Sequence, residues 1–382
     1  MKFLIKIILI FIIFIIYNTN LFSRQIYVNE NTGDDKISIN NNSPANPFKT
    51  ISMAILASSA KDEIIIEGFD SSKKQQIIYR ESLKIDSTKY RLKLTGKNNP
   101  LLDGGQAASK DSELKPGKNA IVVDARGVSI DGISMKNYQL NKKDKLPKEP
   151  LGVAIYVKTG ISYVVIKNCN IENCNYGIIL DGAIMCDISN NKISNITVIE
   201  GKKDSNGGIG IAVFPSGLGI EGNLIGTKGA NIITKSAKYG ICIGSPATEK
   251  NADGTKILNN TIQECEKGLG ILNVTGIGEV SKNNFTGNNL ALYIMGFPID
   301  IWISENIFGG SKGASEIEAN EKCDGFYLYD LWQRANNKFE KPTFAAVEGD
   351  DKIPLVKNVM YIRTQEAKAR EDAGSAYKVK TK

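Results

Sequence analysis

The chain has 382 residues, of which 42% are apolar, and this is enough for a large buried core. Its formal net charge of +7 comes from 48 basic and 41 acidic residues, an excess too mild to indicate a nucleic-acid partner. The sequence has no histidine, which excludes mechanisms that need an imidazole base and most zinc or copper sites.

The first 23 residues predict an export signal. Lys2 and Lys6 are followed by an apolar run over 7–16 and a polar stretch, with Ser23 as the small residue at the cleavage point. A run of this length suits a signal peptide and is shorter than the roughly 20 residues needed to cross a bilayer. We therefore expect a signal peptide over 1–23 and no transmembrane span after cleavage. An uncleaved N-terminal anchor is the alternative. The protein is expected in the periplasm, at the cell surface or outside the cell.

A short amphipathic helix is predicted over 51–60, after a strand over 26–29. Ile51, Ala54 and Ile55 recur at helical spacing. A stack of coils leaves its first coil open to water and to edge pairing, so a helix at this position is expected to cap it.

Residues 120–310 carry an internal repeat of the form Ile-x-x-Asn-x-Ile. Copies that begin at Ile257, Val280 and Ile303 are 23 residues apart, and the longer steps contain insertions. The apolar residues are β-branched and alternate with polar ones in segments too short for helices. Several short strands in each repeat predict stacked coils of a parallel β-helix, which share one continuous core.

The repeated asparagine is explained by this stacking. Successive coils lie about 4.8 Å apart, so equivalent side chains form a column in which each amide can bond the amides above and below it. The alternative is that asparagine merely marks surface turns. The predicted ladder consists of Asn191, Asn223, Asn260, Asn283 and Asn306.

The N-terminal part resembles the opening of the pectate-lyase-like right-handed β-helix superfamily. The resemblance rests on Tyr27-Val28, Gly33-Asp34-Asp35, the run Ser-Pro-Ala-Asn-Pro-Phe-Lys-Thr-Ile over 43–51, and Leu102-Asp103-Gly104-Gly105. With the repeats it covers about 26–310. It implies an all-β fold, a right-handed single-stranded parallel β-helix with an N-terminal capping helix, which we place at 24–345 with a polar tail over 346–382. It specifies activity poorly, because the superfamily includes lyases, hydrolases, epimerases and binding proteins.

Candidate catalytic residues lie beside the first isoleucine of each repeat, where side chains are expected to point outward. Uronate-cleaving members of the superfamily need Ca²⁺ or basic groups to neutralise the substrate carboxylate, and a Lys or Arg to take the α proton. Lys167 and Arg126 are the candidate bases, with Asp131 beside Lys167. A solvated exterior with compensating charges is the alternative. The same exterior would place Asp187, Glu221 and Lys256 in contact with substrate. Asp181 is a candidate Ca²⁺ ligand or a plain turn residue.

Three lysine-rich insertions, over 136–151, 194–207 and 226–239, are predicted to follow the repeat at the same stage of the coil. Insertions at one stage gather on one face, often the binding face. A basic rim there would fit an acidic polysaccharide, and Tyr138, Tyr176 and Tyr239 could stack on its sugar rings. A solubilising loop edge is the simpler explanation.

The cysteines are predicted to be mostly small buried residues, because the most tempting pair, Cys174 and Cys265, falls about 14 Å apart in the repeat and a bridge needs about 7 Å at most. Three functions remain open for a chain that we expect to be monomeric. It could be a polysaccharide lyase that acts by β-elimination, a non-catalytic glycan-binding protein, or a structural or adhesive surface protein. No cofactor other than Ca²⁺ is indicated.

Overall fold

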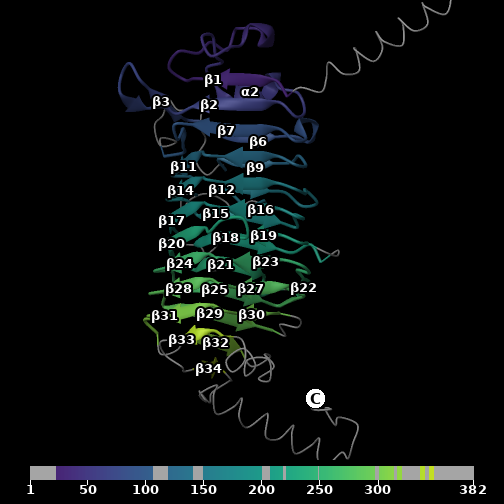
Figure 1. The fold of residues 1–382 in the computed structure, drawn as a ribbon, viewed down its shortest axis with the longest axis vertical. Helices are drawn as coiled ribbons and strands as arrows, with labels where there is room; N and C mark the ends of the chain where they lie inside the picture. The colour runs from purple at the N-terminus through teal and green to yellow at the C-terminus, as the bar shows by residue number, and fades with distance from the viewer. Residues whose placement is uncertain are drawn as a thin grey trace, which may run out of the picture.

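The chain folds into a right-handed parallel β-helix, in which coils stack along one axis (Figure 1). The fold class predicted from the repeat is therefore confirmed. The computed structural model describes residues 23–105, 119–140, 149–199, 207–217, 221–247, 249–296, 301–313, 316–320, 336–339 and 344–347. Three predicted segments lie outside these ranges: the signal peptide, a last strand expected at 325–329 and nearly all of the polar tail.

Each coil contributes one strand to each of three ten-stranded parallel sheets. The first sheet holds β1 (Gln25–Val28), β2 (Glu63–Glu67), β7 (Lys93–Lys97), β10 (Ser129–Asp131), β13 (Val165–Lys167), β16 (Asp187–Ser189), β19 (Leu224–Ile225), β23 (Lys256–Leu258), β27 (Glu279–Ser281) and β30 (Ile303–Ser304). The second sheet holds β5 (Ile78–Tyr79), β8 (Leu101–Asp103), β11 (Ser134–Lys136), β14 (Asn170–Glu172), β17 (Lys192–Ile196), β20 (Ile232–Ser236), β24 (Thr261–Gln263), β28 (Asn284–Thr286), β31 (Ile307–Gly309) and β33 (Lys338–Phe339).

The third sheet follows the second in each coil and carries the candidate site. Its strands are β6 (Leu83–Ile85), β9 (Ile121–Val123), β12 (Val153–Val157), β15 (Tyr176–Asp181), β18 (Ile209–Phe214), β21 (Tyr239–Gly244), β25 (Lys267–Leu272), β29 (Leu290–Met295), β32 (Ile317–Asn320) and β34 (Phe344–Val347). Smaller elements of the described chain are the antiparallel pair β3 (Phe69–Asp70) and β4 (Gln75–Gln76), the parallel pair β22 (Lys250–Asn251) and β26 (Val274–Thr275), and 3₁₀ turns at Ile39–Asn41 and Ser87–Lys89.

The core is built from columns of equivalent residues on the three inner faces. In the first sheet the first isoleucine of each repeat is aligned with the next, as in the pairs of Ile166 with Ile188 and of Ile188 with Ile225. All three are fully buried. A coil on its own could not bury such a face, so burial between coils stabilises the stack.

An asparagine ladder runs between the first and second sheets, and its membership corrects one prediction. Each ladder amide donates to the next ladder oxygen, at 3.0 Å from Asn260 to Asn283 and at 3.0 Å from Asn283 to Asn306. Asn223 is not a member, because its Oδ1 accepts from the main chain of Cys186 at 3.0 Å in another turn. The ladder consists of Asn191, Asn231, Asn260, Asn283, Asn306 and Asn337.

The physical reason is an insertion inside the turn itself. Ile225, the last residue of the predicted copy, pairs with Ile188 and is therefore the first isoleucine of its coil. The residues after it lengthen the turn, and Asn231 then takes the ladder position. The insertion predicted at 226–239 is therefore corrected: residues 226–231 form a longer turn between the first and second sheets, and 232–236 form β20. The insertions predicted at 136–151 and 194–207 follow the second-sheet strands β11 and β17 in the chain, as expected, and 141–148 and 200–206 lie outside the described residues.

A column of glycines runs through the third sheet, where each is the second residue of its strand: Gly177, Gly210, Gly240 and Gly268. A Cβ on Gly177 would lie 2.3 Å from the carbonyl oxygen of Gly210, and one on Gly210 would lie 2.5 Å from that of Gly240. Gly240 and Gly268 have the same close approach to the next coil. Only glycine lets consecutive coils approach this closely where the chain enters the third sheet.

The predicted capping helix is present as α2 (Ile51–Ala57), which buries Ile51, Ala54 and Ile55 against the first coil. Thr50 accepts a hydrogen bond from the main chain of Met53 at its start.

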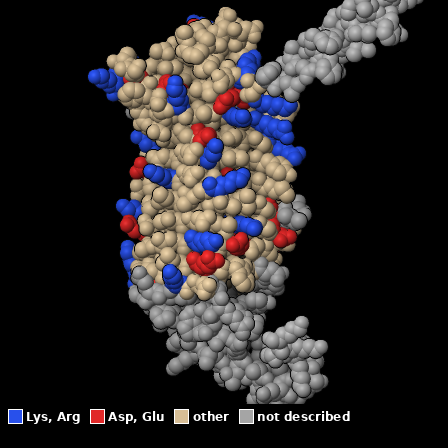
Figure 2. All heavy atoms as spheres, viewed as in Figure 1, with Lys and Arg blue, Asp and Glu red and all other residues tan. Residues whose placement is uncertain are grey.

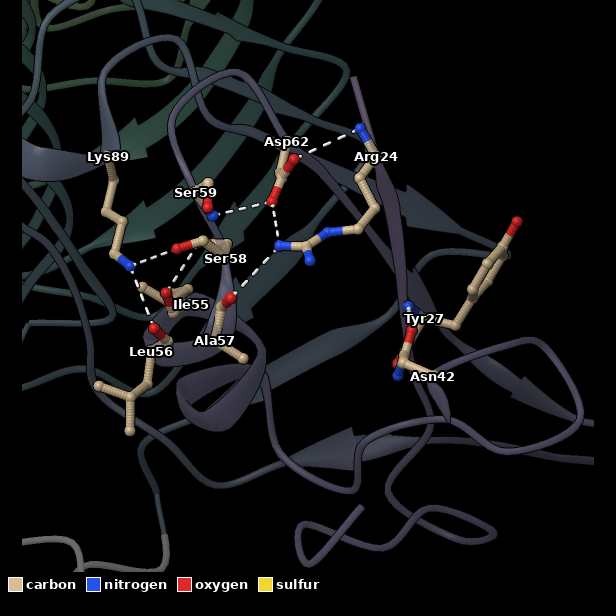
Figure 3. A network of polar contacts seen from close by, with 10 residues as sticks. All are labelled: Arg24, Tyr27, Asn42, Ile55, Leu56, Ala57, Ser58, Ser59, Asp62 and Lys89. Carbon is tan, nitrogen blue, oxygen red and sulfur yellow. Dashed lines mark hydrogen bonds and ion pairs between the residues drawn. The ribbon is translucent and has the colours of Figure 1, made fainter. Parts of the chain in front are cut away.

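Two cations satisfy the carbonyl groups at the end of α2 (Figure 3). Lys89 Nζ donates to the carbonyl oxygens of Leu56 and Ser58, at 3.1 and 2.6 Å. Arg24 bonds Ala57 O and pairs with Asp62 at 2.7 Å. These cations stabilise the unpaired carbonyl end of the helix, so the cap is fixed to the first coils.

The five described cysteines are buried and free, as predicted. Their environment is apolar, and burial raises the pKa of the Cys169 thiol to about 12. Among the described residues there is no helix of the length and apolarity needed to cross a membrane.

Candidate functional site

The outer face of the third sheet carries apolar side chains where a solvated surface would be polar. One column of outward residues runs through Tyr156, Ile179, Ala212, Cys242, Gly270 and Tyr293, each paired with the next. The side chains shrink toward Gly270, and a tyrosine stands at each end. This column therefore forms a floor that is low in the middle and bounded by rings.

A hollow of about 210 Å³ lies beside this column, and Cys242 is the column residue that lines it. Its floor includes Cys242, which is only 2% exposed. Tyr239 lies in the same hollow and covers Gly270, since a Cβ on Gly270 would be 2.5 Å from the Tyr239 ring. An apolar concavity with aromatic walls and few polar groups is the usual form of a ligand site. The lining is completed by Tyr176, Gly207, Ile209, Phe214, Lys238, Gly244, Ser245, Pro246 and Leu272.

Two lysines bring positive charge to this face. Lys238 lines the hollow. Lys267 lies between two rings, with Nζ 5.4 Å from the centroid of Tyr239 and 5.3 Å from that of Tyr293. Both rings attract the charged ammonium, so this geometry suits a lysine that binds an anion rather than one that abstracts a proton.

A polar contact marks the N-terminal side of the floor. Tyr156 donates its hydroxyl hydrogen to Asp181 Oδ2 at 2.9 Å. Burial, followed by this bond to a carboxylate, raises the pKa of Tyr156 well above its usual range. Asp181, the candidate Ca²⁺ ligand, is thus engaged by a tyrosine. In the described ranges no group of three or more acidic or cysteine side chains could hold a metal ion.

Four of the predicted catalytic and binding residues, Asp131, Lys167, Asp187 and Lys256, lie on a different face, the outside of the first sheet. Asp131 and Lys167 are neighbours in one outward column and form an ion pair at 3.2 Å. Lys256 pairs with Glu279 at 3.6 Å in another. Both pairs are partly solvated, and within each pair the lysine and the carboxylate compensate each other's charge. The structure therefore gives Lys167 and Asp131 a charge-paired surface position, and their catalytic role stays a prediction.

Two carboxylates of the predicted set are placed differently from the expectation. Asp187 lies opposite Val165 rather than beside Lys167, and its Oδ2 pairs with Lys228 at 2.8 Å. Glu221 is not on the sheet, because the strand of its coil begins at Leu224. It is 1% exposed, and its Oε1 accepts hydrogen bonds from Ser216. Burial raises the pKa of the Glu221 carboxyl above its usual value.

The remaining candidates separate into a surface cation and tyrosines of different exposure. The Arg126 guanidinium lies over the Tyr163 ring, 4.7 Å from its centroid. The nearby carboxylate of Asp124 pairs with Lys158 at 3.8 Å. Tyr138 is 3% exposed in the core and donates to Glu81 O at 2.6 Å, so it has no free face for a sugar ring. The other two tyrosines, Tyr176 and Tyr239, do line the hollow.

Three residues of this face, Phe214, Cys242 and Tyr293, were not predicted, and each falls at an outward position of a third-sheet strand. Lys267 was not predicted either, and it is the first residue of β25. Lys238, a lysine of the predicted basic rim, lines the hollow just before β21. The signal in the sequence was an apolar or aromatic residue at positions that alternate with buried ones. Without the register of the third sheet, those residues read as part of the core.

The stacked coils and the three parallel sheets give the chain the fold of a right-handed parallel β-helix protein. No protein-family model matches the chain, and no curated protein sequence matches it. Among solved structures, a rhamnogalacturonan lyase has a TM-score of 0.51 at 13% identity, with 83% of this chain and 87% of that chain covered.

Two other solved structures show lower similarity. Pectate lyase Pel9A has a TM-score of 0.47 at 14% identity, over 86% of this chain and 79% of that chain. An alginate lyase from a Paenibacillus strain has a TM-score of 0.35 at 10% identity, over 76% of this chain and 92% of that chain. At 13% identity, the similarity to the rhamnogalacturonan lyase shows the fold alone and leaves function to be argued from the site.

Proposed function

We propose that the chain is an exported protein that binds an acidic polysaccharide on the outer face of its third sheet. The observation that carries the proposal is the hollow over Cys242, with tyrosine rings and lysine ammonium groups around it. Aromatic rings bury the apolar faces of sugar rings, and ammonium groups pair with carboxylates.

The length of the face favours a polymer. The outward column from Tyr156 to Tyr293 spans six neighbouring strands of the third sheet. At about 4.8 Å for each step this is a surface of roughly 24 Å, longer than one sugar unit. Binding along such a face allows several weak contacts to add up.

Binding is favoured over catalysis by the chemistry of the described groups. The chain has no histidine. Lys267 is held between two rings, and the Cys242 thiol stays protonated at ordinary pH because burial raises its pKa to about 12. Neither group is arranged to abstract a proton from a uronate.

A lyase that acts by β-elimination is the second candidate function. It is favoured by Lys238 in the hollow and by the fold shared with rhamnogalacturonan lyase. A Ca²⁺ ion that neutralises the substrate carboxylate belongs to this candidate.

A panel of polysaccharides tests both candidates. Binding is measured by affinity electrophoresis with polygalacturonate, rhamnogalacturonan, alginate and a neutral xylan, and product formation is followed by the absorbance of unsaturated uronates with and without Ca²⁺. We expect retardation by the acidic polymers without an absorbance rise. An absorbance rise would establish the lyase instead, and silence in both assays would leave a structural or adhesive protein.

A further inference from the structure

A strip of exposed cations and rings lies at the turns that join the third sheet to the first, near the N-terminal end of the helix. Its members, which we call the turn strip, belong to successive coils that are joined by main-chain hydrogen bonds. Lys61 N bonds Tyr90 O at 3.0 Å, and Arg91 N bonds Arg126 O at 2.8 Å. The turn strip consists of Lys61, Tyr90, Arg91, Arg126 and Tyr163.

The backbone holds these side chains outward at a conformational cost. Lys61, Arg91 and Tyr163 have φ angles of 69°, 58° and 61°. This left-handed region is uncommon for residues other than glycine, asparagine and aspartate, and unusual for a bulky ring. Gly127 takes the same conformation in the coil between Arg91 and Tyr163. The same conformation occurs at Lys235 and Glu264 elsewhere in the described chain, so it belongs to the turns of the coils, and the turn strip is set apart by its charge and exposed rings.

The cations of the turn strip lack carboxylate partners within the described ranges. Elsewhere on the surface lysines are paired, as in Lys167 with Asp131 and Lys256 with Glu279. Near the turn strip the carboxylates are already engaged, Asp62 by Arg24 at 2.7 Å and Asp124 by Lys158 at 3.8 Å. Figure 2 shows Lys and Arg side chains gathered along one edge at this end of the molecule. The local charge is therefore uncompensated.

Apolar surface accompanies the charge. Tyr90 and Tyr163 are 47% and 46% exposed, and Leu56 is 71% exposed. Leu56 lies beside the turn strip, because its carbonyl oxygen accepts a hydrogen bond from Lys89, the neighbour of Tyr90 (Figure 3). Tyrosine with lysine and arginine is the combination that settles at the boundary between lipid headgroups and acyl chains.

We infer that the turn strip docks on an anionic membrane surface, where Lys61, Arg91 and Arg126 contact lipid phosphate groups. The chain itself favours this partner over a second polyanion. Arg24, which pairs with the neighbour of Lys61, comes directly after the segment that holds the apolar run over 7–16. The turn strip thus lies at the place where the folded domain meets the one strongly apolar stretch of the sequence. With the N-terminal segment retained, which is the alternative to the cleaved signal peptide, the chain has a single weak apolar anchor beside a basic patch, and the two together give stable membrane attachment.

Vesicle flotation of the full chain tests the inference. The probes are vesicles of phosphatidylcholine alone and of phosphatidylcholine mixed with phosphatidylglycerol, at low and high salt. The readout is the ratio of binding to the two vesicle types, since both offer the same acyl interior to the apolar run. The test variant carries Lys61→Gln, Arg91→Gln and Arg126→Gln. The matched control carries Lys74→Gln, Lys192→Gln and Lys312→Gln, which removes the same charge from exposed lysines elsewhere.

We expect the ratio to fall about tenfold or more in the test variant, and to change little in the control. Circular dichroism confirms that both variants are folded. An unchanged ratio in the test variant, or an equal loss in the control, would overturn the inference. Loss of polygalacturonate retardation with an intact vesicle ratio would also overturn it, by assigning the turn strip to the polysaccharide. The hollow is untouched by these substitutions, so failure here is distinct from failure of the proposed function.

Discussion

Asn231 Oδ1 accepts two hydrogen bonds from Asn191, one from its main-chain nitrogen and one from Nδ2, both at 3.0 Å. The two residues are far apart in the sequence, yet they occupy the same turn of consecutive coils. This contact fixes the register between the coil that carries Phe214 and the next coil, which carries Tyr239, and so it positions two walls of the hollow.

The first prediction concerns the cost of removing one ladder amide. Asn283 Nδ2 donates to Ile257 O at 2.9 Å and to Asn306 Oδ1 at 3.0 Å, and its Oδ1 accepts from Asn260. Asn283→Ala leaves these buried groups without partners and should lower the free energy of unfolding by roughly 3 kcal/mol. The side chain of the neighbouring Asn284 accepts one hydrogen bond among the described contacts, from the Thr286 hydroxyl, so Asn284→Ala should cost about 1 kcal/mol or less. Urea denaturation measures both, and equal losses would contradict the ladder.

The second prediction concerns the aromatic wall. Tyr239→Ala removes the ring that covers Gly270 and flanks Lys267, and should weaken polysaccharide binding by about tenfold. Tyr27→Ala, a partly exposed tyrosine of β1 on the first sheet, is the control and should leave binding unchanged. Isothermal titration with oligogalacturonides distinguishes them. The same affinity for both variants would argue against the hollow.

The third prediction follows from the buried carboxyl of Glu221. Its Oε2 has no hydrogen-bond partner in the described structure, and burial raises its pKa above the usual 4.5. The folded state therefore holds this proton more tightly than the unfolded state. Stability from this group is present at acidic pH and falls as pH rises from 4.5 through the raised folded pKa.

Glu221→Gln should remove this dependence, because the neutral amide resembles the protonated acid. We expect the variant to gain stability over wild type at neutral pH and to lose that advantage in acid, as measured by thermal unfolding. The exposed Glu305→Gln, which breaks a surface pair with Lys282, serves as the control and should show no such trend. A Glu221→Gln variant that is less stable at neutral pH would show that the ionised form is the favoured one.

The fourth prediction concerns two cysteines with the same thiol chemistry. Burial raises the pKa of both Cys169 and Cys242 to about 12, but only Cys242 lines the hollow. A small alkylating reagent should therefore modify Cys242 before Cys169, and a bound polysaccharide should slow Cys242 alone. Peptide mapping after timed alkylation reports each site. Equal rates for the two thiols would mean that the hollow is closed.

The coil architecture could be predicted from the sequence because the repeat places the same residue at the same position of successive coils. Isoleucine at the inner positions recurs at regular spacing, and the helical spacing of Ile51, Ala54 and Ile55 marks the capping helix. Asn223 was assigned to the wrong turn because an insertion of variable length separates Ile225 from Asn231. The spacing of the Ile-x-x-Asn-x-Ile repeat cannot reveal which of two asparagines faces the neighbouring coil.

The site was harder to predict for a related reason. The charged residues beside Ile130 and Ile166 were predicted to be catalytic candidates, yet Asp131 and Lys167 form an ion pair on the surface. The residues of the hollow are apolar and alternate with core residues, so Cys242 and Phe214 are indistinguishable from interior positions in the sequence. Only the register of the third sheet shows that they point outward.

The most direct test of polysaccharide binding at the third sheet is the affinity of the Cys242→Phe variant for oligogalacturonides. Cys242 belongs to the smaller buried apolar cluster on the outer face of the third sheet, apart from the core inside the coils, and it lines the hollow. A phenylalanine ring there fills the hollow while the coils stay stacked. Isothermal titration of wild type and of this variant, each with its far-UV spectrum checked, should show binding by wild type and at least tenfold weaker binding by the variant. Undiminished affinity in a folded Cys242→Phe protein would contradict the proposed site.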